Sequence, residues 1–130
     1  MGRRSGLILM LSLTLGLAQA QRTVKELLSA AYLGDRAALQ ELIGMGQAGN
    51  AKVQDELGFI YYNGIGMVPK DLVMAASWWR KAAEQGDAGA QFRLALRYAK
   101  GEGVPKDSAT AASWFRKAAE QGEASVVRLK

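Results

Sequence analysis

The side chains of this 130-residue chain that could do chemistry are carboxylates and cations. Asp55 and Glu56 form an acidic pair, and two carboxylates can act as general acid and base in a hydrolase. Adjacent helical residues point to different faces, however, and no nucleophile–base set accompanies this pair. The chain also lacks His, which most neutral-pH acid–base pairs and most metal sites use. The sequence therefore predicts no catalytic, cofactor-binding or metal-binding residue, and a small hydrolase is the weakest functional hypothesis.

A second group with chemical potential is basic. Arg93, Arg97 and Lys100 are spaced at i, i+4 and i+7, which places them on one side of a helix. Such a stripe can bind an acidic peptide or a phosphate. The alternative interpretation is an ordinary solvated helix face.

Four large aromatic side chains come in two pairs, and they could form either a binding cage or a core: Trp78, Trp79, Trp114 and Phe115. Each pair lies among alanines at helical spacing, which is typical of a buried face. We interpret all four as core residues. On that basis Trp114→Ala is expected to cost ~3–5 kcal/mol of stability.

These residues belong to a repeated segment. Residues 49–85 recur as 86–121, with 21 of 36 paired positions identical once a gap is placed at Met67. A period of this length indicates a stack of similar units, each unable to bury its apolar face alone.

Each repeat contains the signals of two helices. The first helices are predicted over Asn50–Asn63 and Asp87–Lys100, with Asn50 and Asp87 as N-caps. Glycine and proline then predict a loop. The second helices are predicted to begin after Asp71 and Asp107, to run to residues 85 and 121, and to end at Gly86 and Gly122.

The segments outside the two repeats also carry helical patterns. Residues 24–33 and 35–43 are amphipathic, and we interpret residues 21–48 as a degenerate hairpin of the same stack, with an ankyrin-like unit as the alternative. Residues 122–130 are predicted to be a capping helix or a truncated repeat, because terminal units often depart from the pattern.

The N-terminus has the features of a secretory signal. Arg3 and Arg4 precede an uncharged, Leu-rich stretch that closes on Ala18-Gln19-Ala20, which predicts a signal peptide over residues 1–20. An uncleaved anchor is the alternative, although the apolar run is short for spanning a bilayer. The absence of Cys excludes a lipid anchor on cysteine and any disulfide. We expect an exported protein, periplasmic or secreted, from a bacterium.

The charge is mildly basic and dispersed. The net charge is +5, and without Arg3 and Arg4 the chain keeps 15 basic and 12 acidic residues, a net charge of +3. Basic residues alternate with acidic ones, so we predict no nucleic-acid partner. An electrostatic binder of cell-wall polymer or of an anionic surface is the alternative function that this charge leaves open.

The repeated residues resemble the Sel1-like repeat, a branch of the tetratricopeptide-type solenoids. The resemblance rests on Ala-x-x-Gln-x-x-Leu-Gly-x-x-Tyr in Ala51–Tyr61, on Gly-x-Gly-(x)-Val-Pro-x-Asp, and on Ala-x-x-Trp-aromatic-Arg-Lys-Ala-Ala-Glu-Gln-Gly. The second copy departs from it at Leu94-Ala95, and Met67 lengthens the first loop. The resemblance implies an all-α, right-handed α/α solenoid of helical hairpins that acts as an adaptor or regulator. Many bacterial members of this family are exported.

In related solenoids the first helices line a concave groove. Our preferred hypothesis is an exported, non-catalytic module that binds a peptide or protein there, with no stable membrane insertion after cleavage of the signal. Phe59 has an alternative role, which is to pack on Phe92 and Leu96. The predicted groove residues, to which the stripe adds Arg93 and Arg97, are Lys52, Asp55, Phe59, Tyr62, Asn63, Phe92, Leu96, Ala99 and Lys100.

Overall fold

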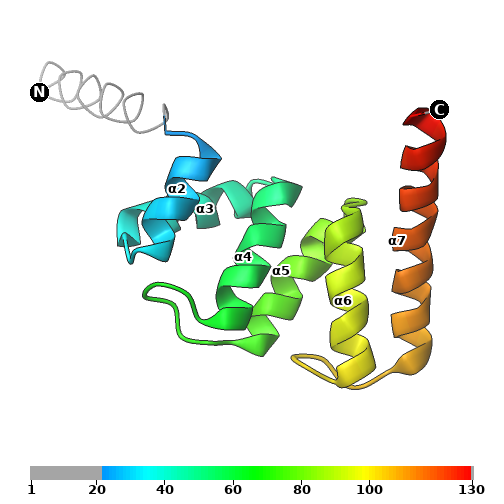
Figure 1. The fold of residues 1–130 in the computed structure, drawn as a ribbon. Helices are drawn as coiled ribbons and strands as arrows, with labels where there is room; N and C mark the ends of the chain where they lie inside the picture. The colour runs from blue at the N-terminus through cyan, green and yellow to red at the C-terminus, as the bar shows by residue number, and fades with distance from the viewer. Residues whose placement is uncertain (1–21, 130) are drawn as a thin grey trace, which may run out of the picture.

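Within residues 22–129, three helical hairpins follow one another (Figure 1). The computed structural model describes residues 22–129, and side chains up to Gly122, so the predicted signal peptide lies outside the described residues. Residues 22–129 contain helices and no strand. The predicted all-α solenoid of helical hairpins is confirmed. Its helices are α2 (Val24–Tyr32), α3 (Arg36–Gln47), α4 (Ala51–Asn63), α5 (Leu72–Glu84), α6 (Ala88–Lys100) and α7 (Ser108–Leu129).

Short polar side chains start the repeat helices, as the sequence predicts. The side chains of Asn50 and Asp87 accept hydrogen bonds from the amides three residues on, at 3.1 and 2.8 Å. Asp71 and Asp107 do the same at 3.0 and 3.1 Å. Each bond satisfies an amide that the first turn of a helix leaves open. The predicted starts of all four helices are therefore confirmed.

The predicted end of the last helix is wrong, because α7 continues through Gly122 to Leu129. Gly86 does end α5, with φ +97°, and Asp87 then caps α6. Gly122 is followed instead by Glu123, which is a good helix former and a poor N-cap. Without a capping residue no new helix begins, and the old one extends.

The N-terminal hairpin packs on the first repeat. The predicted helices over 24–33 and 35–43 are present as α2 and α3, although α3 runs on to Gln47. Leu27 and Leu42 join Leu57 of α4 in one buried cluster. Whether this hairpin is a degenerate unit of the same stack or an ankyrin-like unit stays a prediction.

The aromatic side chains of the two repeats differ in burial. Trp78 and Trp79 are 6% and 2% exposed and belong to two separate buried clusters, which confirms them as core. Trp114 and Phe115 are only half-buried, so the prediction that all four are core is wrong for this pair. The physical reason is position, since α6 covers α5, whereas the described chain has no further hairpin to cover α7.

A buried glutamine joins each repeat to the hairpin before it. Gln54 and Gln91 are 3% and 4% exposed. The Gln54 amide donates to the Gly46 carbonyl of α3 at 2.8 Å and accepts from the side chain of Gln85 at 2.8 Å. Gln91 repeats the pattern, donating to the Ala83 carbonyl at 3.1 Å and accepting from Gln121 at 2.9 Å. Each amide thus links three helices.

The loops between paired helices also contact the preceding hairpin. Gly66 and Gly103 have φ of +68° and +77°. A side chain on Gly66 would collide with the Ala31 carbonyl of α2, and one on Gly103 with the Leu72 carbonyl of α5. Only glycine permits this combination of backbone conformation and close approach.

The hairpin α4/α5 is tight because an indole lies on a glycine. A Cβ atom at Gly58 would come within 2.6 Å of Trp79 Cε2, and the indole Nε1 of Trp79 donates to the Asp55 carbonyl at 3.0 Å. In the second repeat Ala95 takes the place of Gly58, and the smaller Phe115 takes the place of Trp79. The departure at Ala95 is therefore matched by a smaller ring.

Gly58→Ala should destabilise the protein by ~1–3 kcal/mol, because the added methyl group collides with a buried ring. Urea unfolding followed by circular dichroism measures this loss. Gly44→Ala is the matched control. A Cβ there meets nothing within 4 Å, so this exchange in a helix interior should stabilise by up to ~1 kcal/mol. Equal stabilities of the two variants would contradict the packing described here.

The two equivalent tryptophans should respond differently to truncation. Trp78→Ala is expected to cost ~3–5 kcal/mol because it empties a buried site. Trp114→Ala should cost only ~1–3 kcal/mol, since part of this ring is already in water. Thermal or denaturant unfolding of both variants checks the difference, and equal losses would show that the last hairpin is covered in solution.

Candidate protein-binding surface

The predicted groove residues differ widely in exposure. Asp55, Tyr62, Arg93, Leu96 and Ala99 are half-buried. Arg97 is buried, at 5% exposure. The exposed members are Lys52, Phe59, Asn63, Phe92 and Lys100.

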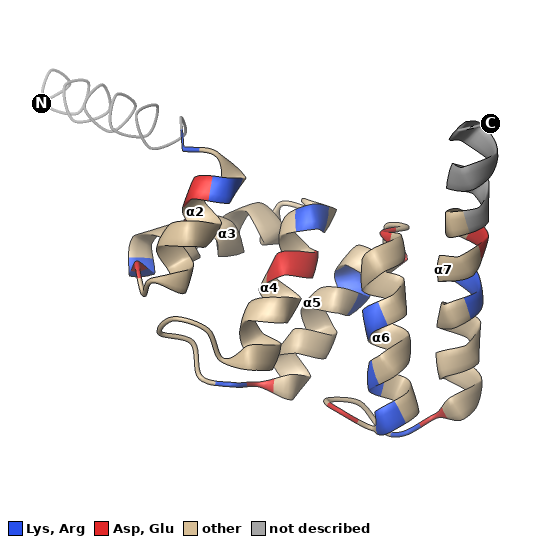
Figure 2. Cartoon of the chain, viewed as in Figure 1, with Lys and Arg blue, Asp and Glu red and all other residues tan. Residues whose placement is uncertain are grey.

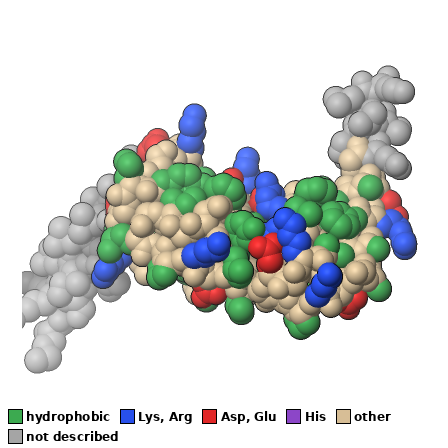
Figure 3. All heavy atoms as spheres, turned by 60° about the horizontal axis from the view of Figure 1, so that its bottom comes forward, with side chains coloured by type: hydrophobic (Ala, Val, Ile, Leu, Met, Phe, Trp, Pro, Cys, Tyr) green, Lys and Arg blue, Asp and Glu red, His purple; other side chains and the backbone are tan. Residues whose placement is uncertain are grey.

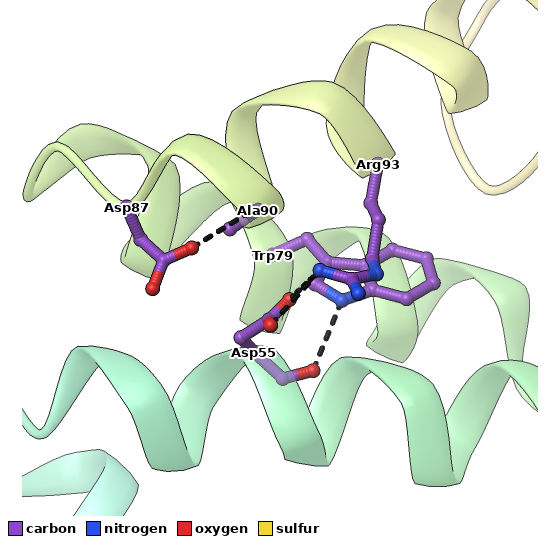
Figure 4. A network of polar contacts seen from close by, with 5 residues as sticks. All are labelled: Asp55, Trp79, Asp87, Ala90 and Arg93. Atoms are coloured by element: carbon purple, nitrogen blue, oxygen red, sulfur yellow. Dashed lines mark hydrogen bonds and ion pairs between the residues drawn. The ribbon is translucent and has the colours of Figure 1, made fainter. Parts of the chain in front are cut away.

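An ion pair joins the first helices of the two repeats. Nη1 of Arg93 on α6 lies 2.9 Å from both carboxylate oxygens of Asp55 on α4 (Figure 4). The Asp55 side chain is 18% exposed, and the backbone carbonyl of the same residue accepts the indole hydrogen bond of Trp79. Asp55 and Arg93 therefore fasten one repeat to the next.

Burial raises the pKa of Asp55 above its ordinary value, although Arg93 opposes the shift. Compared with the unfolded chain, the fold therefore makes protonation of this carboxyl easier, although its ion pair with Arg93 uses the ionised form. The stability that this residue contributes is present at low pH, and it is lost as the pH rises through the raised pKa. As a general acid Asp55 is poorly placed, since Arg93 occupies both oxygens.

Arg97 lies against two neighbouring aromatic rings, whose centres are 5.6 Å apart. Its guanidinium carbon is 4.2 Å from the centre of the Tyr62 ring and 5.3 Å from that of Trp79. One nitrogen forms an ion pair with Glu102 at 3.6 Å, and the Tyr62 hydroxyl donates to the same carboxylate at 3.2 Å. The cation is held by ring faces and by a partly buried carboxylate.

The predicted basic stripe is wrong as an exposed surface. Arg93 is paired with Asp55, Arg97 is buried, and only Lys100 extends freely into solvent. The i, i+4, i+7 spacing is real, but two of its three members hold the repeats together.

The exposed aromatic residues of the first helices are separate. Phe59 is 43% exposed. Phe92 is 51% exposed, and its ring lies edge-on to Phe115 of its own hairpin, with 5.4 Å between the ring centres. Asn63 donates from its side chain to the Phe59 carbonyl at 3.0 Å. Phe59 is thus left as an exposed aromatic side chain on α4.

A pocket of about 570 Å³ lies between α2 and α4. Its volume is in the range of sites that bind ligands or peptide side chains, roughly 300–1,000 Å³. Sequence reasoning found Lys52 at its edge and missed the contribution of α2. The amphipathic pattern of residues 24–33 is similar to that of the first helices of the repeats. Comparing the two patterns could have indicated that α2 contributes to the pocket. The lining residues are Val24, Lys25, Leu28, Ser29, Tyr32, Asn50, Lys52 and Val53.

Charges are spread over the described helices. Lys and Arg occur on several helices among Asp and Glu, although α6 carries basic residues alone (Figure 2). From another side, two apolar areas flank a central group of charged side chains (Figure 3). No helix within residues 22–129 is long and apolar enough to cross a bilayer. Among the same residues, no three His, Cys, Asp or Glu side chains are grouped to hold a metal ion.

The two repeats identify the class of the protein. The family description of the Sel1 repeat matches residues 51–87 and 88–123, which together make up more than half of the chain. The chain belongs to the Sel1 repeat family. Proteins of this family are generally protein-interaction modules and typically non-catalytic scaffolds.

Two solved structures are similar to this chain. One is a Sel1 repeat protein from Oxalobacter formigenes, with 40% identity, a TM-score of 0.65, and coverage of 68% of this chain and 65% of that one. The other is c5321, a protective antigen present in uropathogenic Escherichia coli strains displaying an SLR fold, with 48% identity and a TM-score of 0.61. That match covers 65% of this chain and 18% of the antigen. No curated protein matches the chain.

Arg97→Ala should destabilise the protein by ~2–4 kcal/mol, because it removes a buried cation and leaves Glu102 without its ion pair. Lys100→Ala, on the same helix but exposed, should change stability by less than ~0.5 kcal/mol. Denaturant unfolding of the two variants measures the contrast. If Arg97→Ala left the free energy of unfolding unchanged, Arg97 would have to be an exposed residue that is available for binding.

Proposed function

We propose that this protein is an exported, non-catalytic interaction module that binds a peptide or protein segment along its first helices. The observation that carries the proposal is the pocket between α2 and α4, which is mainly apolar and has Lys25 and Lys52 at its edge. The exposed Phe59 lies on the same α4 helix. Exposed apolar surface rimmed by polar residues is typical of protein interaction sites.

The pocket fits a peptide or protein segment that has an apolar side chain as its anchor. Val24 and Leu28 line the pocket and would contact such a side chain, while Tyr32 offers a ring with a polar end. A buried hydrogen bond from Gln54 joins α4 to the hairpin that contains α2, and we expect the pocket to be formed before binding. Pre-formed sites lose less entropy on association.

A purely electrostatic role in binding cell-wall polymer receives less support. The net charge without Arg3 and Arg4 is only +3, and the exposed lysines Lys25, Lys52 and Lys100 are separated by acidic residues. Salt separates the two hypotheses. Electrostatic capture should be lost at 1 M salt, where screening acts over about 3 Å, whereas an apolar anchor should persist.

Export rests on the predicted signal peptide at residues 1–20. Cell fractionation followed by mass spectrometry of the intact protein should find it outside the cytoplasm, with an N-terminus near Gln21. A cytoplasmic protein that keeps Met1 would contradict export without affecting the binding surface.

Photo-crosslinking in living cells tests the surface directly. A photoreactive phenylalanine analogue placed at Tyr32 or Phe59, which are 38% and 43% exposed, replaces one aromatic side chain by another. Both probes are expected to give the same crosslinked partner. A probe at the exposed Ser77 of α5 is the control and should not give it. Identical products from all three positions, or none from Tyr32 and Phe59, would refute the proposed surface.

A further inference from the structure

A second apolar hollow lies at the far end of the array, between α6 and α7. It has a volume of about 580 Å³ and is lined by Ala88, Gly89, Phe92, Phe115, Ala118 and Ala119. Figure 3 shows an apolar area beside the end of α7. None of the predicted roles of the groove accounts for this surface.

The preceding repeat shows what such a surface binds. By the alignment of the repeats, the equivalent positions are Ala51, Lys52, Asp55, Trp79, Ala82 and Ala83. There α6 covers part of the surface, since its Ala90 and Leu94 form a buried cluster with Trp79, Ala82 and Ala83, while Lys52 stays exposed. Phe115, Ala118 and Ala119 of the hollow are the counterparts of the residues on which α6 packs.

Its chemistry differs from that of the preceding site. Phe92 replaces Asp55, which pairs with Arg93, and Ala99 replaces Tyr62, which stacks on Arg97. The two positions that contact Arg93 and Arg97 in the first repeat are thus occupied by apolar residues in the second. A helix that binds here must present apolar and small side chains where α6 presents Arg93 and Arg97.

Within the described residues, α7 itself carries such a face. Phe115, Ala118, Ala119 and Gly122 follow each other at helical spacing, Ala119 and Gly122 are exposed, and a Cβ on Gly122 would meet nothing within 4 Å. The helix at the other end, α2, exposes the charged Lys25 and Glu26. A head-to-tail contact with α2 would bury those charges, and it would also produce open filaments.

We propose that this face is a dimerisation surface, on which the α7 helices of two copies of the chain pack antiparallel about a two-fold axis. With Ala118 of one copy opposite Ala119 of the other, Phe115 lies opposite Gly122, and large meets small on both sides. One isologous contact then covers both hollows. The inference is independent of the proposed function, because it uses the opposite end of the array.

The oligomeric state of the protein isolated from cells tests the inference. Light scattering coupled to size exclusion, at concentrations up to about 100 μM, should show a dimer. Ala119→Glu brings two carboxylates together near the axis and should raise the dissociation constant by about 100-fold or more. Ala109→Glu, at an exposed position on another side of α7, should leave association unchanged. A monomeric wild type, or a dimer that Ala119→Glu does not weaken, overturns the inference.

A second measurement does not require a charge at the interface. The chain contains no cysteine, so Ala119→Cys introduces a single thiol. Antiparallel pairing places the two thiols close to the axis, and mild oxidation should give a disulfide-linked dimer within minutes. Ala109→Cys should give much less, and circular dichroism shows whether each variant is folded. Equal crosslinking of the two variants would also overturn the inference.

Discussion

The arrangement of the hairpins depends on a buried amide that must have all its hydrogen bonds. Gln54 and Gln91 are almost fully enclosed, and an unpaired amide there would cost several kcal/mol. Each one donates to a carbonyl of the preceding hairpin and accepts from a glutamine of its own repeat, Gln85 or Gln121. These directions fix the register of one hairpin on the next. The apolar contacts supply stability, and the amides select one arrangement among many similar ones.

This register determines which side chains remain for binding. It brings Asp55 against Arg93 and places Arg97 against the rings of Tyr62 and Trp79, so charged residues of the first helices become connections between repeats. It also sets α2 beside α4, where their apolar side chains enclose a pocket. The binding surface is what the connections between units leave exposed. Its chemistry is consequently more apolar than a list of first-helix residues implies.

Local signals in the sequence were sufficient for most of the fold. Asn50, Asp71, Asp87 and Asp107 mark helix starts through contacts only three residues long, and the repeat itself indicates the stacking. The errors concern contacts between distant segments. Arg97 is buried by rings from α4 and α5, which its own helix pattern does not reveal. The last hairpin is less covered than its sequence predicts. Its residues follow the repeat pattern of an internal unit, whose second helix is covered by the next hairpin. In the described chain no hairpin follows α7.

The glycines of the two loops give the stack a direction. Gly66 lies close to the Ala31 carbonyl, and Gly103 lies close to the Leu72 carbonyl. Each loop therefore contacts the hairpin that precedes its own in the chain. A ribosome releases the polypeptide from its N-terminus, and every hairpin therefore emerges when its support has already been made. Removal of the first hairpin would take away the carbonyl that Gly66 approaches, whereas removal of the last hairpin would leave that contact in place. The order of synthesis is therefore also the order in which the contacts between hairpins can form.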